Sequence, residues 1–288
     1  MVKSTIQLAL NQINDPSPIQ HIQQVTGGSI NESFYVKTEK REYFIKTHPN
    51  APSEFFQIEA EGLEKIRETQ TIAVPQVYAY SNNPGGSFLA LEWIEGSKSS
   101  DTEIRLGENM ARLHQHFNDQ HGYDNRTYIG MIPLNNGLFD SWIEYYGKVR
   151  LNGQLQIGIT NGRISGERRH RLEKLISSLD TFIPKHIKAS YLHGDLWGGN
   201  WIAGENGEPY VIDPSFLYGD RHLDLAFTEL FGGFSKQFYE AYDDVFSVDK
   251  NYEDFKEIYQ LYYLLVHLNI FGKTYGPAVD RILKKYIG

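Results

Sequence analysis

One stretch, YLHGDLWGGNWI at residues 191–202, constrains the fold of this chain more than any other. It places Asp195 five positions before Asn200, and Asp213 follows at the end of YVID, an apolar run that favours a β-strand. A carboxylate and a carboxamide spaced in this way can both offer oxygen ligands to Mg²⁺, which prefers oxygen and keeps several waters. Asp195 is then placed to accept a hydroxyl proton beside the metal. The spacing predicts Asn200 and Asp213 as metal ligands and Asp195 as the catalytic base.

This layout is the one used for phosphoryl transfer from ATP in the kinase fold, which requires partners upstream. A lysine on the third strand must hold phosphates, and Lys46 in FIKT fits that position. A glutamate on the following helix must pair with the lysine. Glu59 in QIEAEGLEKI fits, with Glu61 as the alternative. The two segments therefore predict an ATP site formed by residues far apart in the sequence.

Two further segments are predicted to contact the nucleotide. The turn GGSIN lies between the first two predicted strands, where the fold needs a loop over the phosphates, although it is not G-x-G-x-x-G. Backbone N–H groups near Gly28 and Ser29, or the side chains of Ser29 and Asn31, are the expected phosphate donors. Glu92 and Trp93 lie where the linker between two lobes would offer backbone groups to adenine.

The periodicity of apolar residues changes character near residue 94. Before it, a first helix at 4–13 is followed by strands and by one further helix that begins near its predicted N-cap, Ser53; the strands are 21–26, 33–37, 42–47, 76–81 and 87–93. After it, leucines recur at helical spacing. We therefore predict an α+β, two-lobed protein-kinase-like fold: an N-terminal nucleotide-binding lobe at 1–93 with a small antiparallel sheet, a hinge at 94–98, and a mainly helical catalytic and substrate-binding lobe at 99–288.

Composition narrows the class of protein. The 288 residues carry a net charge of −8, which disfavours a nucleic-acid-binding role. Cysteine is absent, so disulfides and thiolate catalysis are excluded, and the histidines have no supporting carboxylates that would suggest zinc. The N-terminus has no signal-peptide pattern, and the most apolar run, 262–271, is too short to span a bilayer. We expect a cytoplasmic protein with no membrane partner, and a monomer by default.

Several segments resemble the fructosamine kinase family, also called ketosamine-3-kinases. The most specific are LHGDLWGGN and VIDPSFLYGDRHLDLAFTELFGGF; GGSIN, YFIK, EAEGLEKI, LALEWI and IGMIPLNNGLFDSWIEYYGKVRL also look like that family. Trp197 is the most distinctive residue. Protein kinases have H-R-D in this loop, and aminoglycoside and choline kinases usually lack the following L-W-G-G.

The resemblance implies a small-molecule kinase that uses ATP and Mg²⁺ to phosphorylate the 3-hydroxyl of a ketosamine, a sugar attached to an amine by glycation. The 3-phosphate makes the adduct prone to release, so the implied role is repair of glycated amines or proteins. Some relatives carry cysteine in the slot of Ser29, so a thiol switch there is not available to this chain. Trp197 is expected either to stack on the substrate or to pack the loop against a helix.

Alternatives remain at this stage. The same residues would serve an aminoglycoside or choline kinase, and the degenerate glycine loop would suit an inactive kinase-fold binding module. A protein Ser/Thr kinase is disfavoured because D-F-G and A-P-E segments are absent. Among the other polar residues, we expect His193 to support the loop by hydrogen bonding, Asp224 to anchor it from the next helix, and His114 to be a core residue.

Overall fold

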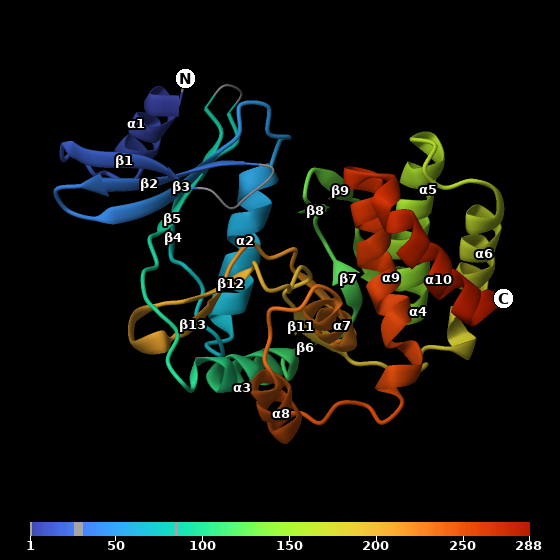
Figure 1. Ribbon diagram of the computed structural model, residues 1–288. Coiled ribbons are helices and arrows are strands. Elements are labelled where there is room, and N and C mark those ends of the chain that lie inside the picture. Colours follow the sequence, from blue (N-terminus) through green and yellow to red (C-terminus); the bar gives the residue numbers. More distant parts are fainter. Residues whose placement is uncertain (1, 26–30, 84–85) are drawn as a thin grey trace.

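The first third of the chain forms an antiparallel sheet in the order β1-β2-β3-β5-β4. In the computed structural model, which describes residues 2–25, 31–83 and 86–288, this sheet lies at one end of the molecule (Figure 1). Its strands are β1 (Ile19–Val25), β2 (Glu32–Thr38), β3 (Glu42–Thr47), β4 (Val77–Ser81) and β5 (Phe88–Glu92). They match the predicted strands to within about two residues, the ordinary uncertainty of strand ends.

The sheet is covered by a helix on each face. Alternate residues of β5 separate the two sides: Phe88 and Ala90 pack with α1 (Val2–Gln12), whereas Leu89 and Leu91 belong to the core that includes α2 (Phe55–Glu68). This is the expected two-residue alternation of a strand buried on both faces. The sheet therefore fixes the position of α2 relative to β3.

The predicted N-cap of α2 is wrong. Glu54, not Ser53, precedes the helix; it has a left-handed φ of 68°, and its side chain forms no capping hydrogen bond. Oδ1 of Asn82, in the β4–β5 loop, accepts a hydrogen bond from the N–H of Phe56 at 3.2 Å instead. A side chain distant in sequence thus satisfies one of the free N–H groups that every helix N-terminus presents.

The rest of the chain is mainly helical, with helix α9 passing through its core (Figure 1). Most of α9 is buried, which explains its nearly continuous run of apolar and aromatic residues. The helices are α3 (Thr102–His114), α4 (Trp142–Tyr145), α5 (Asn152–Thr160), α6 (Gly166–Ser177), α7 (His222–Leu230), α8 (Lys236–Val245), α9 (Tyr252–Phe271) and α10 (Gly276–Ile287). A π-helix at Tyr146–Leu151 joins α4 to α5.

Of the short strands in this part, only β13 was predicted, by the β-favouring run YVID that it overlaps. One sheet has the order β10-β7-β14-β11-β6, and two hairpins pair β12 with β13 and β8 with β9. The strands are β6 (Phe117–Asn118), β7 (His121–Tyr123), β8 (Thr127–Ile129), β9 (Ile132–Leu134), β10 (Gly137–Phe139), β11 (Ala189–Leu192), β12 (Trp201–Ala203), β13 (Pro209–Val211) and β14 (Leu217–Gly219). The other segments of two to four residues are too short to show an alternating pattern, so only their tertiary pairing reveals them.

The segment 94–98 links β5 to the turn before α3, where the hinge is predicted. Among the described residues, no helix combines the length and the apolar character needed to cross a bilayer.

Candidate active site

Lys46 on β3 connects two predicted site residues. Its Nζ lies 2.7 Å from Oε1 of Glu59 on α2 and 2.6 Å from Oδ1 of Asp213. Glu61, the alternative to Glu59, points elsewhere and accepts hydrogen bonds from Gln57 and Asn125. The structure therefore brings Glu59 to the lysine and leaves Glu61 out of this group.

The charges around Lys46 keep it protonated. Its side chain is only 4% exposed, and burial alone would lower its pKa, but the carboxylates of Asp213 and Glu59 outweigh burial and raise the pKa. A cation so held cannot act as a base near neutral pH. It can bind anionic groups, because the side chain of Asp213 is 42% exposed and leaves the cluster open on that side.

The loop after β11 is held by buried polar groups. The carboxylate of Asp224 on α7 accepts hydrogen bonds from the backbone N–H groups of His193 and Gly194, at 2.7 and 2.8 Å. His193 is fully buried; its Nε2 lies 2.8 Å from the carbonyl oxygen of Ile212, and its Nδ1 accepts from the N–H of Asp195 at 3.2 Å. Both residues thus have the supporting contacts expected from the sequence.

Two buried residues beneath the loop extend this support. His114 is fully buried between the hydroxyl of Tyr242 and the carboxylate of Asp224, as expected of a core residue. The hydroxyl of Tyr263 on α9 donates to the carbonyl oxygen of Gly194 at 3.0 Å. The sequence did not single out Tyr263, because a tyrosine in an apolar helix looks like any other core aromatic residue.

Asp195 and Asn200 form a hydrogen-bonded pair across the loop. Nδ2 of Asn200 donates to Oδ2 of Asp195 at 2.9 Å and to its carbonyl oxygen at 2.8 Å. The pKa of Asp195 is raised to about 7, chiefly by burial. The hydrogen bond from Asn200 lowers it, and the charges of Asp213 and Asp224 raise it further, within that net value. A carboxyl group that titrates near neutral pH is suited to general-base catalysis.

Asn200 and Asp213 offer oxygen atoms of the kind that Mg²⁺ binds. Because Nδ2 of Asn200 binds Asp195, its Oδ1 faces away and has no hydrogen-bond partner among the described residues. Asp213 has a left-handed φ of 56°, an uncommon conformation that aspartate tolerates better than most residues. No group of three or more His, Cys, Asp or Glu in the described ranges could hold a metal, so this pair suits an ion that takes its other ligands from water and phosphates.

Trp197 lies on the surface of the same loop. Its side chain is among the exposed aromatic groups of the chain, at 39% exposure. The indole covers Gly199 so closely that a Cβ at Gly199 would lie 2.3 Å from the ring. Trp197 therefore packs on its own loop and still presents aromatic surface to solvent.

The predicted nucleotide contacts in the N-terminal part are only partly described. Gly28 and Ser29 lie outside the described residues, whereas Asn31 is half-buried and its Oδ1 has no hydrogen-bond partner in the described part of the chain. The N–H of Glu92 donates to the carbonyl oxygen of Gln76, so it is not a free donor for adenine. The ring of Trp93 packs against Tyr35, with ring centroids 4.6 Å apart.

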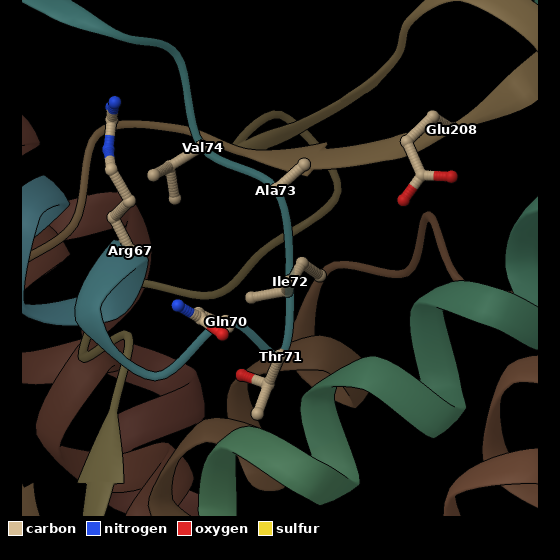
Figure 2. Close-up of a pocket in the computed structure, with 7 residues that line it drawn as sticks. All are labelled: Arg67, Gln70, Thr71, Ile72, Ala73, Val74 and Glu208. Atoms are coloured by element: carbon tan, nitrogen blue, oxygen red, sulfur yellow. The ribbon is translucent and has the colours of Figure 1, made fainter.

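A strap at residues 70–74 ties the two parts of the chain together beside this site. The N–H of Val211 donates to the carbonyl oxygen of Ala73 at 3.0 Å, which attaches the strap to β13, the strand that leads to Asp213. A hollow of about 340 Å³ lies between this strap, Arg67 of α2 and Glu208. Figure 2 shows the side chains that line it. None of its lining residues is a predicted site residue, so the hollow lies outside the candidate active site.

A buried lysine paired with a helix glutamate, together with a loop that carries the Asp195–Asn200 pair, agrees with the class that the comparisons give: the protein is an ATP-dependent phosphotransferase of the two-lobed kinase fold. The comparisons give the family. The fructosamine kinase family matches residues 1–288, and this chain belongs to it. The fold and the recognition predicted from the sequence are thereby confirmed.

Individual relatives agree over most of their length. A probable ketoamine kinase of Enterococcus faecium is 36% identical over 91% of this chain and 94% of its own. The chloroplastic protein-ribulosamine 3-kinase of Arabidopsis thaliana is 33% identical over 93% of this chain and 83% of its own. The crystal structure of a putative fructosamine-3-kinase from Haemophilus somnus has a TM-score of 0.90 at 31% identity, covering 100% of this chain and 98% of that one.

Proposed function

We propose that this chain transfers the γ-phosphoryl group of ATP to the 3-hydroxyl of a ketosamine. The family and the names of its relatives, ketoamine kinase and protein-ribulosamine 3-kinase, support the substrate class. The observation that carries the chemistry is the convergence of Lys46, Glu59 and Asp213 within 2.7 Å contacts, next to a loop with Asp195. Repair of glycated amines or proteins is the role that follows.

In this proposal each charged residue has one task. Lys46 binds phosphate oxygens and Glu59 orients Lys46. Asp195 accepts the proton as the substrate hydroxyl oxygen forms its bond to the γ-phosphorus, while the bond from that phosphorus to the ADP oxygen breaks. Asn200 and Asp213 would hold Mg²⁺, which neutralises charge on the phosphates. Gly28, Ser29 and Asn31 would cover the phosphates, and backbone groups near Glu92 and Trp93 would contact adenine.

The position of Trp197 supports a role in substrate binding. The indole is exposed on the loop that carries Asp195, and aromatic faces bind both sugar C–H surfaces and cationic amines. We propose that it stacks on the sugar or the amine-bearing arm of the ketosamine.

A substrate panel tests the proposal. Purified protein is mixed with Mg-ATP and with fructose-lysine, ribulose-lysine, an erythrulose adduct, choline or kanamycin, and ADP release is measured with phosphate position determined by NMR. We expect turnover on at least one ketosamine with phosphate at O3. Turnover on choline or kanamycin alone would instead favour the related small-molecule kinases, and no turnover on any substrate would favour the inactive binding module.

A further inference from the structure

A second hollow lies along α2, and its lining includes Glu61, Glu64 and Glu68 but not Lys46 or Glu59. It has a volume of about 510 Å³ and lies between α2, β4, and the strands β7 and β14. The lining residues are Ala60, Glu61, Glu64, Lys65, Glu68, Val77, Tyr80, Tyr123, Asp124, Asn125 and Tyr218. None of these residues has a task in the proposed phosphoryl transfer.

The floor of this hollow is aromatic and carries a free hydroxyl. Tyr123 is 5% exposed and Tyr218 is 8% exposed, and their rings contact each other with centroids 5.8 Å apart. The ring of Tyr123 is buried, and its hydroxyl has no hydrogen-bond partner among the described residues. Its oxygen is accessible from the hollow, so it is open to a hydrogen bond from a donor group of a ligand.

The wall and rim of the hollow are acidic. Glu61, Glu64, Glu68 and Asp124 contribute carboxylates. Glu68 pairs with Lys65 at 3.0 Å, Glu64 pairs with Arg67 at 3.5 Å, and Glu61 accepts neutral hydrogen bonds from Gln57 and Asn125. Asp124 is exposed and forms no hydrogen bond or ion pair within the described part of the chain. Burial, and after it the charges of Glu61, Asp124 and Glu68, raise the pKa of Tyr123 to about 12.

The spacing of the carboxylates selects the kind of cation. They do not converge as a group that could hold a metal ion in the described residues. An elongated alkylammonium group fits better, because its charge can lie among the carboxylates and against the tyrosine rings while its methylenes cover Val77 and Ala60. The volume is also in the range of organic-ligand pockets, roughly 300–1,000 Å³.

We propose that this hollow is a binding site for an alkylammonium group, either the end of a free polyamine or a lysine side chain of a peptide. The ammonium donates to the hydroxyl of Tyr123 and to carboxylates of α2 and Asp124. The site is separate from the candidate active site, and its occupation does not depend on the substrate proposed there.

Isothermal titration without ATP or ketosamine tests this site on its own. The probes are spermidine, a pentalysine peptide, and 1,8-octanediol as an uncharged control, all at low salt. We expect saturable binding of at least one amine and none of the diol. Tighter binding of spermidine identifies the polyamine source, and tighter binding of pentalysine identifies the peptide source.

Variants then locate the binding. Glu61→Gln/Asp124→Asn removes two carboxylates and is expected to weaken amine binding by about tenfold, because two solvent-accessible ion pairs with the amine are lost. Tyr123→Phe is expected to weaken it by a few fold. Glu39→Gln/Asp244→Asn, which removes two exposed carboxylates elsewhere, should leave it unchanged. Absence of saturable amine binding, equal binding of the diol, or equal weakening by the two double variants would overturn the proposal.

Discussion

Asp195 and Asp213 are two aspartates of one site in opposite surroundings. Asp213 follows β13, and its Oδ1 lies 2.6 Å from Nζ of Lys46. Asp195 lies on the loop after β11, where its side chain receives a neutral hydrogen bond from Asn200 at 2.9 Å. Burial raises the pKa of Asp195 to about 7.

The difference teaches that the surroundings, not the residue type, assign the two tasks. A carboxylate fixed beside a buried cation suits a ligand for metal and phosphate. A carboxyl group without a cation, held near neutral pKa, can take up and release a proton during turnover. The predictions below test this contrast.

The largest effect is expected from Asp195→Asn. Loss of the proposed base should lower kcat by about 10³-fold, in the usual range for general-base catalysis of 10²–10⁴. ATP should still bind, because Lys46 and Asp213 are intact. Steady-state kinetics and nucleotide titration measure both, and turnover within tenfold of the wild type would disprove the assignment.

The same variant has a stability signature. The pKa of Asp195 is raised in the folded state, so folding is favoured when the carboxyl is protonated, and this contribution is lost as pH rises from about 4 towards 7. Asparagine does not ionise and can still accept the bond from Asn200. Its melting temperature at pH 8 should therefore equal or exceed that of the wild type, and a lower value would contradict the proposed surroundings.

Lys46→Met should have the next largest effect, because it removes the cation that contacts Asp213 and is proposed to bind phosphate. We expect kcat/KM for ATP to fall on the order of 10²-fold, as for loss of one electrostatic group at a transition state. The variant should also be less stable, since Glu59 is 13% exposed and would lose its partner. Lys37→Met, which changes an exposed lysine of β2, is the matched control and should leave ATP kinetics unaltered.

A smaller, continuous effect is expected from pH. Asp195 must be deprotonated to accept the hydroxyl proton, so kcat/KM should fall about tenfold per pH unit below its pKa of about 7 and level off above it. A pH profile with a ketosamine substrate measures this. A limb near pH 4 instead would mean that Asp195 is not the titrating base.

Trp197→Ala should have the smallest effect, because it removes an exposed aromatic ring from the loop of Asp195 and leaves the charged residues of the site in place. The expected result is a rise of about fivefold in KM for the ketosamine, as for loss of about 1 kcal/mol of aromatic contact, with KM for ATP unchanged. Trp197→Phe should keep most of the affinity. Equal KM values in all three proteins would favour a role confined to packing on Gly199.

The sequence predicted the elements that have a clear pattern. β3 was placed at residues 42–47, where the structure has it, because Tyr43 and Ile45 alternate with Phe44 and Lys46. Except for β13, which the run YVID predicted, the strands of two to four residues in the helical part were missed, since such short segments show no periodicity. Ser53 was wrongly taken as the N-cap of α2, because Asn82 reaches that end from another turn.

By itself, the sequence determined the family, the kinase order of Lys46, Glu59, Asp195, Asn200 and Asp213, and the chemical groups available for phosphoryl transfer. Only the tertiary structure decided between Glu59 and Glu61, because their side chains leave α2 in different directions and one alone reaches Lys46. It also decided which aspartate has a cation beside it. Ionisation depends on burial and on neighbours brought together by folding, and neither is written in the local sequence.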